Sequence, residues 1–517
     1  MATEHLLQEF PPVSTEAWEA VILKDLKGAD YAKKLIWRTD EGLAVRPYYR
    51  AEDSVGLEYS SSLGARTTGD WRIREEIDAT DPREANSAAH TAVVAGAEEI
   101  SFRNVVIANA SDLALTLANL QDIPVHFENA SEPIIRLLLE RFASPQKPVH
   151  VSTGWNPLTN LDFAAEVAKS APDGFIPFTI HGEEFGEAGA TAVEEAGLAL
   201  AAGIDFLAAL QARSVNVDKA AASLAFSFAT GSNYFFEIAK LRAFRAIWAQ
   251  AITSFGGSRE SATTRIYART SRWNETIFDP HVNVLRGTTE AMSAVLGGAD
   301  SVTVAPFDEC YKTPDDASRR LARNTQILLK QEALLSRVAD AGAGSYCLEV
   351  ITDFIAREGW KRMQTIEAAG GYQKAKADGV VAQILDKSRD AKEKAVSVRR
   401  RIFTGTNQHA NLNEKALDRI EASHLSGLHR GTEAYEQLRL RTERHVAATG
   451  KNPRVLLAEI GDAKMRSARS GFTANFFGCA GFDLVTKKFA SVDEILADSA
   501  DVIVLCSSDP EYLALAT

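Results

Sequence analysis

From Asp70 onward, short runs of apolar and β-branched residues alternate with longer segments of helical periodicity. This alternation is typical of a parallel sheet whose strands are connected by helices. The eight predicted strands are 71–76, 99–107, 123–128, 148–153, 175–181, 223–229, 264–269 and 301–307. A closed (β/α)8 TIM barrel requires eight strands, so we predict an α/β fold built on such a barrel. A doubly wound open sheet would show the same alternation.

The chain has 517 residues, too many for one compact core, and its pattern predicts four parts. These are an N-terminal arm (1–55), the barrel (56–370), a helical connector (371–450) and a final unit (451–517). The final unit begins a flavodoxin-like β-α-β-α-β pattern, with strands at 454–460, 482–485 and 501–507 and helices within 468–480 and at 492–498. Three strands leave one sheet edge open, so we expect this partial unit to continue past Thr517 in the natural protein.

Composition excludes several classes of function. Apolar residues make up 45% of the chain and charged residues 24%, as in ordinary globular proteins. The net charge of −12 repels nucleic acids and anionic membranes. The four cysteines form no C-x-x-C pair, and neither a signal peptide nor a membrane-spanning run is present. We therefore predict a cytoplasmic protein with reduced thiols that binds neither nucleic acid nor membrane.

Five motifs follow one another in the barrel region. They are DWRIR at 70–74, FTIHGEEFGEAGA at 178–190, NYFFEIAKLR at 233–242, RIYARTSRW at 265–273 and DPHVNVLRGTTEAM at 279–292. In order, spacing and length they resemble the methylmalonyl-CoA mutase family, whose members are adenosylcobalamin-dependent isomerases of acyl-CoA. The resemblance runs with gaps from about residue 43 to the end. It implies a barrel that threads acyl-CoA along its axis and a flavodoxin-like, cobalamin-binding-like domain behind it.

The C-terminal unit departs from the family at its cofactor motif. Catalytic members carry D-x-H-x-x-G, in which the histidine ligates cobalt, the aspartate orients the histidine and the glycine lets the corrin approach. Here Ala463, Met465 and Ala468 stand at these three positions. The resemblance therefore implies that this chain does not bind the cofactor.

The barrel departs from the family in the same way. The substrate-contacting histidine of R-x-H-x-Q-T-S aligns with Tyr267, and the glutamine of that motif aligns with Arg269. The active-site glutamine of Q-E-A-G-A aligns with Gly186. A radical rearrangement needs polar groups that hold the thioester and the carboxylate. We therefore expect no catalytic residue and no metal site in this chain.

This combination is similar to the small, non-catalytic (beta) subunits of heterodimeric members of the family. It implies a large catalytic partner subunit that binds adenosylcobalamin and interconverts (R)-methylmalonyl-CoA and succinyl-CoA in propionate metabolism. The role of the present chain would be to pair with that partner and stabilise it, with the arm and connector wrapping around it.

Two alternatives remain open. One is a small subunit of a mutase for another branched acyl-CoA. The other is an independent barrel enzyme with new chemistry around Tyr267, His181 and the acidic residues Glu183, Glu184 and Glu187. A packed tyrosine, a hydrogen-bonded histidine and a solvated acidic helix start explain the same residues without catalysis.

Overall fold

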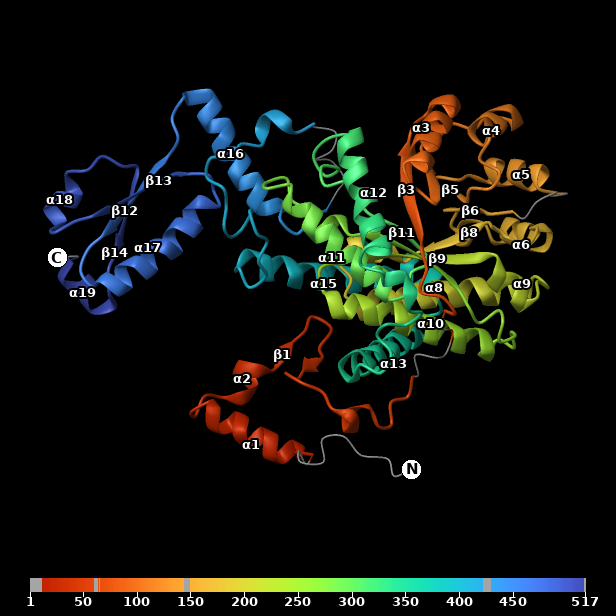
Figure 1. The fold of residues 1–517 in the computed structure, drawn as a ribbon, viewed down its shortest axis with the longest axis horizontal. Helices are drawn as coiled ribbons and strands as arrows, with labels where there is room; N and C mark the ends of the chain where they lie inside the picture. Colours follow the sequence, from red (N-terminus) through yellow and green to blue (C-terminus); the bar gives the residue numbers. More distant parts are fainter. Residues whose placement is uncertain (1–11, 60–63, 65, 144–148, 422–428, 516–517) are drawn as a thin grey trace, which may run out of the picture.

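A computed structural model describes residues 12–59, 64, 66–143, 149–421 and 429–515. In Figure 1 the barrel and its surrounding helices lie on the right and the small C-terminal sheet unit lies on the left. A helical connector lies between them. The N-terminal arm lies below the barrel in this view. None of the helices described in these ranges is both long and apolar enough to cross a membrane.

The largest sheet is an all-parallel barrel. Its strands are β3 (Arg72–Asp78), β4 (Glu99–Arg103), β5 (Val125–Phe127), β6 (Val151–Thr153), β7 (Phe175–Ile176), β8 (Phe178–His181), β9 (Leu224–Thr230), β10 (Arg265–Thr270) and β11 (Ser301–Thr303). They follow the order β7-β6-β5-β4-β3-β11-β10-β9-β8. Strand β7 pairs with β6, β8 pairs with β9, and only Pro177 separates β7 from β8, so the sheet closes on itself.

The predicted (β/α)8 barrel is therefore confirmed, with one predicted strand, 175–181, split into two. Proline has no amide hydrogen to donate to a neighbouring strand, which explains the break at Pro177. The carbonyl of Pro177 still takes part in the barrel, because it accepts a hydrogen bond from Thr153 Oγ1 at 2.6 Å. Pro148, the first residue of the predicted strand 148–153, lies outside the described residues.

Helices surround the barrel. They are α3 (Pro82–Val94), α4 (Ala110–Thr116), α5 (Glu132–Arg141), α6 (Leu161–Ser170), α7 (Gly182–Glu187), α8 (Ala192–Ala212), α9 (Val217–Ala222), α10 (Tyr234–Ser254), α11 (Val282–Leu296), α12 (Asp316–Gln331) and α13 (Tyr346–Ala368), with 3₁₀ turns η2 (Pro157–Thr159), η3 (Arg272–Asn274) and η4 (Leu335–Arg337). Helices α8 and α10 are buried around most of their circumference because α13 packs across both of them.

The N-terminal arm consists of α1 (Thr15–Asp25), α2 (Tyr31–Leu35), the two-stranded hairpin β1 (Trp37–Arg38) and β2 (Ala44–Val45), and the turn η1 (Ala51–Ser54). Helix α1 has no buried residue. The hairpin holds the arm to the body, since Val45 is buried and Trp37 meets Phe236 of α10 edge-on at 5.7 Å. The arm is thus anchored at the hairpin, while α1 contributes nothing to the core.

The connector contains α14 (Tyr372–Ala377), α15 (Val380–Ser397), η5 (Leu417–Arg419) and α16 (Glu433–Thr449). The C-terminal unit contains β12 (Arg454–Glu459), α17 (Ala463–Gly478), β13 (Asp483–Lys488), α18 (Val492–Leu496), β14 (Val502–Cys506) and α19 (Asp509–Leu515). Its strands are parallel in the order β13-β12-β14, as the predicted flavodoxin-like pattern requires. Helix α17 begins five residues before the predicted 468, because Asp462 caps it by accepting a hydrogen bond from the Met465 amide at 2.8 Å.

Candidate functional site

Tyr267 lies inside the barrel. It is 7% exposed and clusters with Ile176 of β7 and Ala225 of β9. The ring of His126, on β5, meets the tyrosine ring edge-on at 5.5 Å. Burial raises the pKa of Tyr267, so its hydroxyl stays protonated at neutral pH. The residue therefore has the environment of a packed interior tyrosine.

An ion pair next to Tyr267 fills the same interior. The Arg74 guanidinium lies 4.0 Å from the centre of the tyrosine ring, and its Nε donates to Glu99 Oε1 at 3.0 Å. Arg74 and Glu99 are only 7% and 2% exposed. On the other side, His126 Nδ1 lies 2.8 Å from Ser152 Oγ. Side chains from β3, β4, β5, β6 and β10 thus contact one another inside the barrel.

His181 ends strand β8, where TIM-barrel enzymes place their chemistry. Its Nδ1 lies 2.6 Å from Glu183 Oε1, and its Nε2 lies 2.6 Å from the carbonyl oxygen of Gly154. A carbonyl and a carboxylate only accept, so both ring nitrogens donate and the ring is cationic. Burial alone would lower the pKa of His181, but the charge and hydrogen bond of Glu183 and the Gly154 carbonyl raise it to about 10. His181 is therefore not a general base at neutral pH.

Within the described ranges, one group of side chains, Glu128, His181 and Glu183, has ligand atoms close enough together to hold a metal ion. Both nitrogens of His181 are already used as donors, so the ring offers no lone pair to a cation. Glu183 also accepts a short hydrogen bond from Ser227. The geometry is that of an internal ion pair.

The other two glutamates of the acidic stretch do not join this group. Glu184 is exposed. Glu187 accepts hydrogen bonds from the amides of Arg272 at 3.0 Å and Trp273 at 3.1 Å, which start the turn η3. The structure thus separates Glu183, Glu184 and Glu187 and does not assemble them into an acid–base pair.

Arg269, near the end of β10, lies in a network of half-buried charges. Its Nε donates to Glu76 at 3.0 Å and its Nη2 to Glu309 at 2.6 Å, while Arg272 also donates to Glu309. Burial lowers the pKa of Arg269, but the two carboxylates raise it well above its usual range. Glu309 lines a cleft of about 550 Å³ at this end of the barrel together with Arg103 and Arg272. The arginine is held by carboxylates of the protein itself.

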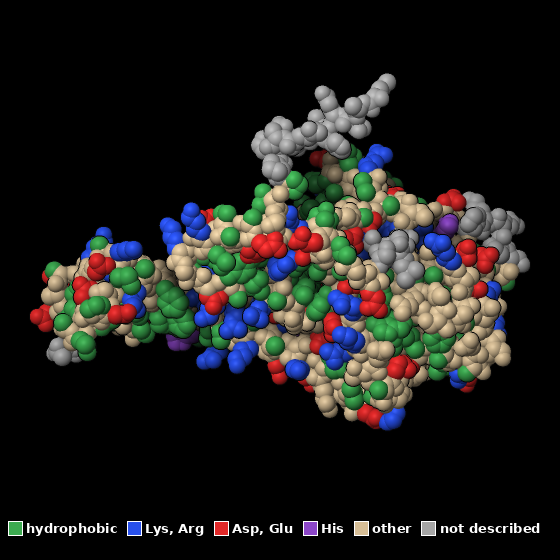
Figure 2. Space-filling model, turned by 90° about the horizontal axis from the view of Figure 1, so that it is seen from below, with side chains coloured by type: hydrophobic (Ala, Val, Ile, Leu, Met, Phe, Trp, Pro, Cys, Tyr) green, Lys and Arg blue, Asp and Glu red, His purple; other side chains and the backbone are tan. Residues whose placement is uncertain are grey.

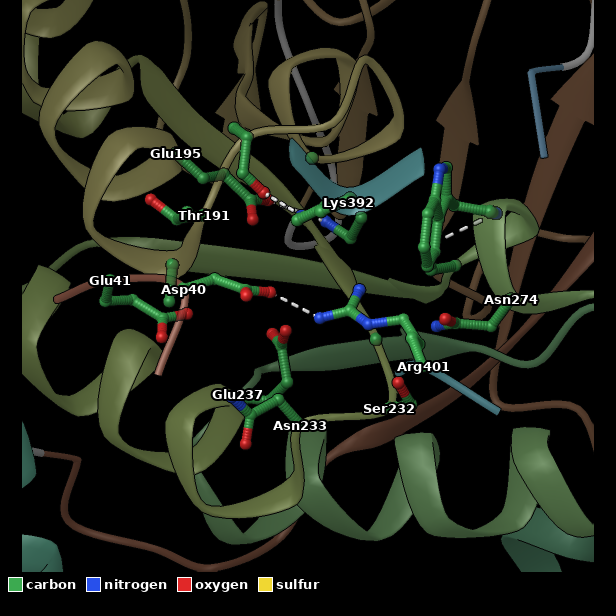
Figure 3. A pocket seen from close by; sticks show the side chains of 17 residues that line it. Asp40, Glu41, Thr191, Glu195, Ser232, Asn233, Glu237, Asn274, Lys392 and Arg401 are labelled. Carbon is green, nitrogen blue, oxygen red and sulfur yellow. Dashed lines mark hydrogen bonds and ion pairs between the residues drawn. The ribbon is translucent and has the colours of Figure 1, made fainter. Parts of the chain in front are cut away.

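Gly186 lies on α7 beside a small polar pocket of about 60 Å³ between the barrel, the arm and the connector. In Figure 3, Asp40 of the arm faces Arg401 of the connector across this pocket, with Glu195 and Lys392 above and Glu237 below. Glu195 and Glu237, which line this pocket, also contact Lys240. The Lys240 side chain is fully buried, and its Nζ lies 2.7 Å from Glu195 Oε2 and 2.5 Å from Glu237 Oε2. Lys392 donates to the carbonyl of Ala190 at 2.6 Å.

Replacing Gly186 by glutamine is expected to destabilise the protein by about 1–3 kcal/mol, because overpacking forces neighbouring side chains to move. The added Cβ would lie 3.0 Å from Ala229 Cβ and 3.1 Å from Glu195 Oε1. Urea denaturation followed by circular dichroism measures the effect. Gly471→Gln on α17 is the matched control, since a Cβ there meets nothing within 4 Å. Equal unfolding midpoints for the two variants would contradict the prediction.

Sequence reasoning missed several buried charged residues, although three of them, Glu237, Lys240 and Glu290, lie inside the family-like motifs 233–242 and 279–292. Glu195, Lys240 and Glu237 are missing from the sequence-based candidates, as are the buried carboxyls of Glu275 and Glu290. One signal was available: Lys240 stands in the apolar stripe of α10, where a lysine must find a buried partner.

Comparison with known proteins identifies the family. The sequence profile described as methylmalonyl-CoA mutase matches residues 159–468. The chain belongs to the methylmalonyl-CoA mutase family. A small subunit of methylmalonyl-CoA mutase from Porphyromonas gingivalis is 38% identical over 98% of this chain and 90% of its own length. The small subunit from Streptomyces virginiae is 32% identical with the same coverage.

A relative named without a subunit, methylmalonyl-CoA mutase from Rhizobium meliloti, is 28% identical over 78% of this chain and 65% of its own length. The two small subunits therefore match this chain more closely and over more of its length. Membership places the chain in a family of isomerases and bears out the resemblance carried by the sequence motifs.

The cobalamin positions of the mutase family lie on the first turns of α17. Ala463, Met465 and Ala468 are all exposed, and Met465 is 36% exposed. Asp462, the carboxylate nearest to them in sequence, caps the helix through the Met465 amide. A histidine–carboxylate pair is not present at these positions, so the residues do not fit the cobalt-ligating role.

Proposed function

We propose that the chain is the small, non-catalytic subunit of a heterodimeric adenosylcobalamin-dependent methylmalonyl-CoA mutase. A large partner subunit binds the cofactor and interconverts (R)-methylmalonyl-CoA and succinyl-CoA, and this chain pairs with it and stabilises it. The observation that carries the proposal is the barrel interior, where the Arg74–Glu99 ion pair, Tyr267 and His126 contact one another.

A substrate threaded along the barrel axis would have to displace an ion pair. Removing Glu99 from Arg74 leaves a charge buried without a partner, which costs several kcal/mol. The thioester would gain little in return, because Gly186, Tyr267 and Arg269 stand where the family has its polar active-site groups. The ion pair inside the barrel and the changed positions support the same conclusion independently.

The N-terminal arm supports pairing with another protein. Trp18, Val21 and Leu23 of α1 are 47%, 57% and 55% exposed, and no residue of this helix is buried. Exposed apolar surface of this kind typically marks a protein–protein contact. In the same proposal, the arm (1–55) and the connector (371–450) wrap around the partner. The barrel spans residues 56–370, and residues 451–517 form a degenerate cobalamin-binding-like domain. The four free cysteines are consistent with a cytoplasmic location.

Expression of the chain alone and together with its catalytic paralogue tests the proposal. The chain alone should neither bind adenosylcobalamin, followed by absorbance, nor form succinyl-CoA. The co-expressed pair should do both and elute as a heterodimer. Mutase turnover by this chain alone, or its stoichiometric cobalamin binding, would overturn the proposal.

Tyr267→Phe separates this proposal from an independent barrel enzyme. The variant is expected to leave kcat and KM of the heterodimer within about twofold, and to lose about 0.5–1.5 kcal/mol of stability with the hydroxyl's hydrogen bond to Ser152. Steady-state kinetics of the pair and urea denaturation of the chain measure the two effects. An acyl-CoA reaction of the chain alone that disappears in this variant would favour the independent enzyme.

A further inference from the structure

Helix α17 exposes two aromatic rings on its outer side. Phe472 and Phe476 are 66% and 56% exposed, and their rings are stacked with centroids 6.4 Å apart. Burying an aromatic ring removes a large apolar area from water, which is favourable. A pair of exposed rings therefore often marks a binding surface.

The segment that follows α15 lies against this helix. The amide of His409 donates to Asn475 Oδ1 at 3.2 Å, and the Arg399 guanidinium lies 5.8 Å from the centre of the Phe472 ring. The segment adds three exposed apolar side chains, Val398 at 56%, Ile402 at 53% and Leu412 at 48%. We call these three residues with Phe472 and Phe476 the waist surface. Figure 2 shows apolar side chains at the narrow junction of the C-terminal unit and the body, with Lys and Arg beside them.

The charge of these two segments is opposite to that of the whole chain. Residues 398–413 and 463–478 together carry six Lys and Arg and no Asp or Glu, in a chain whose net charge is −12. Arg401 and Arg469 pair with Asp40 and Asp509. Within the described part of the chain, Arg399, Arg400, Lys464 and Arg466 form no ion pair. The two segments that carry the waist surface therefore combine exposed apolar side chains with basic side chains, one of which, Arg399, lies over the Phe472 ring.

We propose that the waist surface binds an apolar segment of the partner subunit that is flanked by Asp or Glu. The proposal rests on the proposed function, which requires such a partner. Aromatic residues and arginine are the side chains most enriched at protein interfaces, and two segments that carry basic but no acidic residues favour an acidic counterpart. A polyanion such as RNA or an anionic membrane would meet the repulsion of the whole acidic chain.

Binding of the full-length chain to its purified catalytic paralogue tests the proposal. Phe472→Ser combined with Phe476→Ser is expected to raise the Kd measured by biolayer interferometry at least about tenfold. Val94→Ser is the matched control, since Val94 on α3 is 89% exposed and remote in sequence, and should change the Kd less than about twofold. Arg400→Glu combined with Lys464→Glu should also weaken binding and reduce its dependence on salt. Circular dichroism checks that each variant is folded.

The outcomes separate the two proposals. If the wild-type chain does not pair with the paralogue, the proposed function fails. If it pairs and neither the aromatic nor the charge variant weakens the pair, the waist surface is not the interface and only this inference fails. The wild-type chain is also tested for self-association and for binding to anionic vesicles and to RNA. If the aromatic variant abolishes one of these interactions but pairs normally with the paralogue, the inference is overturned.

Discussion

Replacing Lys240 by methionine is expected to lower the free energy of unfolding by about 3–5 kcal/mol, the usual cost of breaking a buried ion pair. Lys240 is fully buried, and its Nζ contacts the carboxylates of Glu195 and Glu237 and the carbonyl of Ala229. Methionine fills a similar volume but donates no hydrogen bond. The variant would leave two carboxylates and one carbonyl in the interior without the cation that they share.

Urea denaturation at pH 7 measures the effect, with Lys361→Met on α13 as the matched control. The Lys361 side chain is 65% exposed and, among the residues that the structure describes, pairs only with Glu358, so its removal should change stability by less than about 0.5 kcal/mol. Adding Glu195→Gln to Lys240→Met should restore part of the loss, because a neutral amide needs no counter-ion. A loss for Lys240→Met as small as that of the control would show that the buried pair stabilises nothing.

The Lys240 pair also shows which features of this fold are open to sequence reasoning. The eight strands are predictable because apolar and β-branched runs of the right length recur between helical segments, a local property of the chain. The split at Pro177 follows from the missing amide hydrogen of one residue. The early start of α17 depends on a single Asp462 cap, which a hydrophobic pattern does not reveal.

The partners of polar side chains are not predictable from local sequence, because closure of the barrel brings together residues that are far apart in the chain. Arg269 and Glu76, for example, are 193 residues apart and become neighbours only when β3 and β10 join the same barrel. The motif around His181 is readable in the sequence, yet its cationic state depends on the Gly154 carbonyl, contributed by the chain just after β6. The changed family positions are identifiable by resemblance, whereas the contacts of Arg74, Glu99 and Tyr267 inside the barrel are not.

A second buried group gives the protein a distinct dependence on pH. Glu275 and Glu290 are 6% and 2% exposed, and Glu290 Oε1 accepts a hydrogen bond from the side-chain Nδ2 of Asn274 at 2.9 Å. Burial and the charge of Glu309 raise the pKa of Glu275 to about 8. Burial, followed by the charge of Glu275, raises the pKa of Glu290 well above its usual range. The folded protein therefore holds protons that the unfolded chain has already released at neutral pH.

Because the folded state binds more protons than the unfolded state, stability is highest below the unfolded pKa of 4.5 and falls as the pH rises through the folded value of about 8. For Glu275 the loss across this window is about 5 kcal/mol, at about 1.4 kcal/mol for each pKa unit. Glu275→Gln should remove this contribution, so the variant gains stability relative to the wild type as the pH rises. Urea denaturation at several pH values between about 5 and 8 measures the difference, with the exposed Glu332→Gln as control. Parallel stability curves for wild type and Glu275→Gln would mean that Glu275 is ionised in the folded protein, and that Arg269 and Arg272 outweigh its burial.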